Sequence, residues 1–268
     1  LDPTYLNSAG KLENTYRQHE GYGSVALLYS PSPALQLSTA ADLTSATLDA
    51  NLYNFVYPRR ITLQSVMAAK FTVEKFTATA NVLYTQTDEK AKNGDAAENH
   101  RKVSPCLAVS TRPFDDIDLH FRAFYKNIFR LPTFNDLYYS LVGKRDLKPE
   151  DAQQVNLGLT YGISGSDHLP FLSFTADAYR NTIKNKIVAV PVKNMFEWSM
   201  VNYGKVRIDG IDLSLESIFK LPHTMSLSAG GTFSYQKALN MTDPQSSTYK
   251  NQIPYTPRTS GAAHATVE

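Results

Sequence analysis

The residues from Ile117 to Lys126 alternate apolar and polar side chains with a period of two. The apolar face comprises Ile117, Leu119, Phe121, Ala123 and Tyr125, and the other face comprises Asp118, His120, Arg122 and Lys126, with Phe124 as the exception. Such alternation predicts a β-strand with an apolar environment on one side and a polar environment on the other. The run is about ten residues long, the length of a tilted strand that crosses a bilayer.

This pattern recurs along the whole chain and predicts about eleven strands. Clear runs lie at residues 76–85, 171–179, 211–216 and 226–234, and weaker ones near 23–30, 35–43, 61–71, 103–112, 152–162 and 258–267. Short connections alternate with long polar ones, which lie at about 44–60, 86–102, 130–150, 186–203 and 237–255. Tight turns at one end and long loops at the other are typical of outer-membrane barrels. We therefore predict an all-β fold, an antiparallel transmembrane β-barrel.

Aromatic residues flank the predicted strands at both ends. Those beside short turns are Tyr29, Phe71, Phe76, Phe114, Tyr161, Phe171 and Phe219, and those toward long loops are Tyr84, Tyr125, Phe129 and Tyr235. Amphipathic rings gather where a barrel meets the lipid headgroups, so two aromatic girdles favour the membrane fold. The alternative is a soluble all-β binding module in which these rings form the core.

Composition excludes several other classes of protein. Lys and Arg total 27 and Asp and Glu total 25, so the net charge of +2 argues against nucleic acid as a partner. The sequence lacks recognisable catalytic motifs, and its histidines are scattered, so we expect no enzyme, no cofactor and no metal site. Cys106 is the single cysteine and is expected to be a small apolar strand residue.

Two boxes around the longest predicted loop resemble a known family. They are "FRLP" at Phe129–Pro132 and "LKPE" at Leu147–Glu150, followed by the alternating "QVNLGLTYG". The barrel of TonB-dependent outer-membrane receptors has an FRAP-like box followed by one like NPNLKPE. Here Leu131 replaces the usual Ala, and "KRD" stands where that box begins with Asn-Pro. The segments "NYGKVRIDGIDLSLE" and "QIPYTPR" also resemble the family, and the likeness covers most of residues 20–268.

The resemblance implies a 22-stranded barrel filled by a plug domain. Residues 1–268 would be one partial barrel from the C-terminal half, cut at both ends and without the plug. The implied function is import of a scarce nutrient, a ferric siderophore or a cobalamin-like ligand, across the outer membrane of a Gram-negative bacterium. Expected partners are the TonB system through the missing plug, a small nutrient ligand, outer-membrane lipid and, as an accessory, a surface lipoprotein. A structural or adhesive barrel without transport is the alternative.

Two loops supply the candidate ligand-binding residues, because cationic and aromatic side chains are common at recognition surfaces. The candidates are Arg130, Tyr138, Tyr139, Lys144 and Arg145 in the first loop and Phe196, Trp198 and Tyr203 in the second. A purely structural role, with Phe134 and Leu137 packed against neighbouring loops, remains open. Haem receptors of the family place a histidine between the two boxes, and none lies between Pro132 and Leu147. The polar strand faces should line the lumen, with charges at His120, Arg122, Lys126, Asp177, Asp212 and Glu216.

Overall fold

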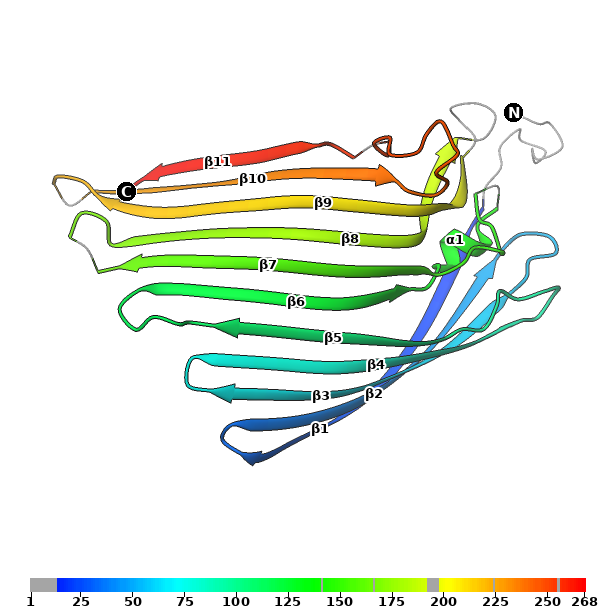
Figure 1. Ribbon diagram of the computed structural model, residues 1–268. Helices are drawn as coiled ribbons and strands as arrows, with labels where there is room; N and C mark the ends of the chain where they lie inside the picture. Colours follow the sequence, from blue (N-terminus) through cyan, green and yellow to red (C-terminus); the bar gives the residue numbers. More distant parts are fainter. Residues whose placement is uncertain (1–13, 141, 166, 192–197, 224, 255) are drawn as a thin grey trace.

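The computed structural model describes residues 14–140, 142–165, 167–191, 198–223, 225–254 and 256–268. Within these ranges eleven β-strands follow one another, and one short helix, α1, lies between β6 and β7 (Figure 1). The bounds are β1 Tyr16–Ser32, β2 Leu35–Ala50, β3 Pro58–Val73, β4 Phe76–Ala91, β5 Arg101–Thr111, β6 Asp118–Arg130, α1 Phe134–Tyr138, β7 Glu150–Ser164, β8 Phe171–Pro191, β9 Trp198–Lys220, β10 Ser226–Asn240 and β11 Thr259–Val267. No helix in the described ranges is long and apolar enough to cross a membrane.

The strands form a single antiparallel sheet in which every strand pairs with its neighbours in sequence, from β1 to β11. The predicted all-β fold and the count of about eleven strands are confirmed. In the described part of the chain the sheet is curved but not closed, since β1 and β11 each pair with one strand only (Figure 1). The helix α1 lies at the end of the sheet opposite the short turns, and we call this end the loop end (Figure 1).

The strands extend further toward the loop end than the alternation indicated. β2 continues to Ala50 and β3 begins at Pro58, so most of the connection predicted at 44–60 is strand. β8 has 21 residues and β9 has 23, roughly twice the length that crosses a bilayer. The predicted bounds of these loops were wrong, because the strands continue through residues that do not alternate regularly between apolar and polar.

The two faces of the sheet have different environments. Arg122 lies opposite Gly158, and Gly158 lies opposite Asp177, so the two charged residues share a face and form an ion pair of 3.1 Å. A methyl group at Gly158 would collide with Asp177 Oδ1, so the glycine leaves room for this pair to lie flat on the sheet. On the opposite face, large apolar side chains are exposed, including Met67 at 73% and Leu157 at 62%. Such exposure is what a lipid-facing surface requires.

The largest buried apolar cluster lies at the loop end and not along the middle of the sheet. It consists of Leu48, Phe55, Phe134, Leu137, Tyr138, Leu147 and Ile187. These residues come from β2, the 51–57 connection, α1 with its following loop, and β8. The segment between β6 and β7 therefore packs across the concave face of the sheet and joins strands that are distant in sequence. The packing predicted for Phe134 and Leu137 is confirmed, since they are 4% and 2% exposed.

Candidate ligand-binding site

The connection from Leu131 to Pro149, which we call the 131–149 loop, begins with a capped helical turn. Thr133 caps α1, its hydroxyl accepting from Asp136 N while the Asp136 carboxylate accepts from Thr133 N at 2.8 Å. This reciprocal capping box satisfies two backbone donors that a helix start leaves unpaired. Arg130 lies between Asp136 and Glu150, with nitrogen–oxygen distances of 3.3 and 3.0 Å. The two ends of the loop are thus tied together at its base.

A buried ion pair anchors α1 to the concave face of β3 and β4. Arg60 Nε lies 2.6 Å from Glu89 Oε2, and the Glu89 side chain is only 2% exposed. Arg60 also donates to the carbonyl of Pro132 at 2.8 Å, and its guanidinium lies 5.0 Å from the centre of the Phe134 ring. The buried guanidinium therefore meets an anion, a carbonyl and an aromatic face, which compensate its loss of hydration.

Tyr138 completes this arrangement. Its hydroxyl donates to Glu89 Oε1 at 2.6 Å and accepts from the backbone N–H of Ala97 at 3.0 Å. Burial and the hydrogen bond to Glu89 raise the pKa of Tyr138 above its ordinary value of 10.0. With 6% exposure, Tyr138 has little surface to offer a ligand, and its geometry favours the structural role that the sequence left open.

Tyr139 has a different environment although it is the next residue. Its ring stacks on Tyr16 with centroids 4.2 Å apart and an interplanar angle of 18°. The Tyr16 hydroxyl accepts from Ser140 N at 2.9 Å and donates to Ser140 Oγ at 2.8 Å. The ring of Tyr139 is half-buried, so one part of it packs against β1 while another part remains accessible.

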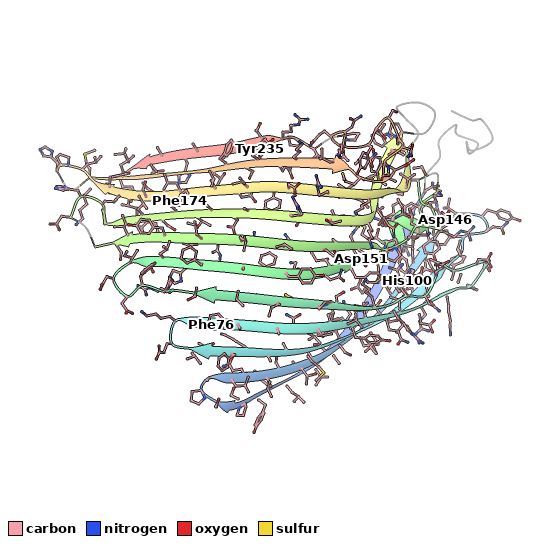
Figure 2. All side chains as sticks on the ribbon, viewed as in Figure 1. Phe76, His100, Asp146, Asp151, Phe174 and Tyr235 are labelled. Atoms are coloured by element: carbon pink, nitrogen blue, oxygen red, sulfur yellow. The ribbon has the colours of Figure 1, made fainter. Side chains whose placement is uncertain are left out.

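The two predicted cations between the boxes are exposed. Lys144 lies 3.5 Å from Asp146, an exposed ion pair that contributes little stability. Arg145 donates to the carbonyl of Asp95 in the neighbouring connection at 3.2 Å. Figure 2 shows Asp146 and His100 at the same end of the sheet as α1, far from Phe76 and Phe174 toward the short turns. Lys144 and Arg145 therefore present positive charge at the surface of the loop end.

The second predicted segment meets the first. The backbone N–H of Met200 donates to Val142 O at 3.0 Å, and the Asn202 side chain bonds both the N–H and the carbonyl of Lys148. Trp198 is 37% exposed at the start of β9. Tyr203 is half-buried against a small apolar cluster of Val206, Ala238 and Ile253. Phe196 lies outside the described residues.

Sequence reasoning missed several residues that build this site. Arg60, Glu89 and Asn202 fell within connections predicted as long polar loops, and their roles depend on contacts at separations of up to 72 residues along the chain. The capping box "TFND" was a usable signal, since Thr followed by an acidic residue three positions later marks a helix start. In the described ranges, no three His, Cys, Asp or Glu side chains are grouped so as to hold a metal ion.

The sequence and fold were compared with known proteins. A family profile described as "TonB dependent receptor-like, beta-barrel" matches residues 4–267. The chain belongs to the TonB-dependent receptor β-barrel family. The resemblance seen in the two boxes is thereby confirmed, and the family consists of outer-membrane transport receptors rather than enzymes.

Relatives of this TonB-dependent receptor chain include transporters of different ligands. It is 27% identical over 191 residues to the vitamin B12 transporter BtuB of Vibrio vulnificus (strain YJ016), a match covering 70% of this chain and 28% of that protein. The apoprotein form of the FrpB iron transporter from Neisseria meningitidis has a TM-score of 0.68 and 16% identity over 95% of this chain and 41% of that one. The hemophore receptor HasR of Serratia marcescens has a TM-score of 0.67 and 14% identity, over 93% and 49% respectively. The chain therefore spans less than half the length of each of these proteins.

Proposed function

We propose that the receptor containing this chain binds a scarce nutrient at its loop end and imports it across the outer membrane with energy transmitted by TonB. The loop end is then extracellular, because long loops of such barrels face the outside. The ligand class that we infer is a ferric siderophore or a cobalamin-like molecule. Membership of a family of outer-membrane nutrient receptors supports this proposal.

One observation carries the proposal. The 131–149 loop is held rigidly by buried contacts, yet it leaves Lys144 and Arg145 exposed beside the half-buried Tyr139. A rigid support with exposed cationic and aromatic groups is suited to capturing an anionic or ring-containing ligand, since little ordering is needed on binding. We retain Lys144, Arg145, Tyr139, Trp198, Tyr203 and Phe196 as the proposed ligand-contacting set, and assign Arg130 and Tyr138 to supporting the loop.

The exposed apolar face supports a membrane barrel over a soluble binding module. Leu157, Met67 and the other outward side chains lie on a sheet face without a second layer in the described part of the chain. Transport distinguishes the proposal from a structural or adhesive barrel. The further partners that we infer are a plug domain, outer-membrane lipid and a surface lipoprotein, with the Gram-negative outer membrane as the location.

Uptake by the full-length receptor tests this function. The receptor is expressed in a Gram-negative host without its own importers, and labelled ferric siderophores, cyanocobalamin and oligosaccharides are offered with TonB intact or deleted. We expect saturable uptake of one ligand class only when TonB is present. Uptake independent of TonB, or the absence of uptake for the whole panel, would contradict the proposal.

A charge-neutralising variant then locates the site. Lys144→Gln/Arg145→Gln should weaken binding of an anionic ligand by about tenfold, because each surface charge contributes roughly 0.2–1 kcal/mol. Lys75→Gln/Lys220→Gln is the matched control, since it removes the same charge beside the short turns. Equal losses in both double variants would mean that net charge acts at a distance and that the loop is not the site.

A further inference from the structure

The outward face of β7–β10 changes from apolar to charged at a single level. One row of cross-strand neighbours is Leu157, Ala178, Ile211 and Tyr235, and the next row toward the loop end is Val155, Arg180, Asp209 and Lys237. Arg180 is the tenth residue of β8, counted from Phe171. A strand that crosses a bilayer needs about 9–11 residues. The charged row therefore lies where the strands leave the hydrocarbon and reach the headgroups of the outer leaflet.

The charged row and its neighbour contain more cations than the local acid can neutralise. One carboxylate oxygen of Asp209 lies 2.5 Å from Arg180 Nε, and the other oxygen lies 3.2 Å from Arg207 Nε. Among the described residues, Arg207 Nε is a buried donor without an aligned hydrogen bond. Lys237 lies opposite Asp209 on β10 and is exposed. Three cations thus share one carboxylate at the edge of a face whose rows toward the short turns are apolar.

A groove runs from these cations down the apolar face. Its volume is about 540 Å³, and its lining includes Leu157, Ala178, Ile211 and Tyr235 below Arg180 and Lys237. Tyr235, labelled in Figure 2, lies on β10. An apolar channel in the bilayer with positive charge at its upper end complements a molecule that has acyl chains and an anionic headgroup.

We propose that this groove is a binding site for a phosphorylated lipid of the outer leaflet. Its phosphate would contact Arg180, Arg207 and Lys237, and one acyl chain would lie against Ile211 and Tyr235. A cross-strand ion pair alone does not account for the arrangement, because Arg180 and Asp209 would suffice for it. The excess positive charge at the boundary of an apolar band favours a lipid whose headgroup is anionic. The site depends on the membrane orientation of the sheet and not on which nutrient is imported.

Native mass spectrometry of the purified full-length receptor in detergent tests the site. The probes are bisphosphorylated lipid A and the same lipid after enzymatic removal of its phosphates. We expect the wild-type receptor to retain the phosphorylated probe and to lose the phosphate-free one. Arg180→Gln/Lys237→Gln should lower affinity for bisphosphorylated lipid A about 10- to 30-fold, since each surface cation contributes about fivefold and Asp209 offsets part of this.

Arg59→Gln/Lys90→Gln is the matched control. These exposed residues lie near the loop end of β3 and β4, and their removal changes net charge equally. Folding is verified by the shift in electrophoretic mobility of barrels on heating. If the Arg180 and Lys237 double variant fails to fold, two single variants replace it. Lys237→Gln probes the headgroup contact and Tyr235→Ala probes the acyl contact. Each should weaken retention of the phosphorylated probe.

Three results of the lipid-binding measurements would overturn the site. They are unchanged affinity of the folded variants, equal loss in the control, and equal retention of the phosphate-free probe by the wild-type receptor. A wild-type dimer that the Arg180 and Lys237 variant converts to monomers would also overturn it. That outcome would mean that a second copy of the receptor, and not a lipid, covers the groove.

Discussion

Replacing Tyr138 with Phe should loosen the 131–149 loop without affecting the sheet. The hydroxyl donates to the buried Glu89 carboxylate at 2.6 Å and accepts from Ala97 N at 3.0 Å. A hydrogen bond to a charged group contributes about 1.5–3 kcal/mol, so its loss should raise local opening by about 10- to 100-fold. Strand amides should retain their protection, because local and global opening have separate free energies.

Hydrogen–deuterium exchange of the full-length receptor measures this opening directly. Peptides that cover residues 131–149 and the neighbouring 92–100 connection should exchange faster in Tyr138→Phe. Tyr139→Phe is the control, since Tyr139 contributes a stacked ring and its hydroxyl has no hydrogen bond in the described part of the structure. Unchanged exchange in Tyr138→Phe, or equal acceleration in both variants, would refute the assignment of Tyr138 as the anchor.

The ion pair beneath Tyr138 gives a second comparison within the same experiment. Glu89→Leu alone leaves the Arg60 guanidinium, whose side chain is 13% exposed, without its anion. Loss of one partner of a buried pair typically costs about 3–5 kcal/mol, whereas replacing both by apolar residues is nearly neutral. Amides of the 131–149 loop should therefore exchange more slowly in Arg60→Met/Glu89→Leu than in Glu89→Leu alone. The opposite order would show that the pair is not effectively buried.

Two further predictions concern the loop end and the inner face. Burial lowers the pKa of His100 from 6.5, so its contribution to stability is present above pH 6.5 and is lost as the pH falls below it. Exchange of the 92–100 connection, corrected for intrinsic rates, should accelerate on acidification in the wild type, and His100→Gln should abolish that dependence. Gly210→Ala should lower the thermal midpoint of the receptor, because the new methyl would lie 2.4 Å from Tyr179 Cζ, whereas Gly23→Ala meets nothing within 4 Å. Equal midpoints for the two alanine variants would show that the ring moves aside freely.

The strands could be predicted because a sheet with one apolar and one polar face imposes a period of two. Each strand has mostly apolar side chains on one face and polar side chains on the other, as the rows containing Leu157 and Arg122 show. The strand ends could not be predicted in the same way. β8 continues as "NTIKNKIVAVP" beyond Arg180, where apolar and polar residues no longer alternate regularly. The extension of β8 depends on its pairing with β9, and the periodicity of the sequence does not reveal that pairing.

The adjacent tyrosines show what sequence reasoning cannot separate. The capping box sets the start of α1, and Phe134 and Tyr138, four residues apart, then face the same side with ring centroids 5.8 Å apart. Tyr139 follows as the C-cap with extended backbone, so its ring leaves that side and reaches Tyr16. The capping signal was visible in the sequence. The partner of Tyr138, Glu89, is 49 residues away, and the register of β3 with β4 places Glu89 opposite Arg60.

The two boxes that carry the family resemblance are largely structural in this chain. Pro132 and Leu147 are buried, and Arg130 joins Glu150 and Asp136 at the base of the loop. Lys144 and Arg145, which lie between the boxes, are instead exposed at the surface. Box residues that are buried or paired fix where the loop lies, while exposed residues are free to differ with the ligand. Ligand discrimination is therefore expected to reside in the segment between the boxes, and exchanging residues 142–146 between receptors should transfer preference while Arg130 and Glu150 stay constant.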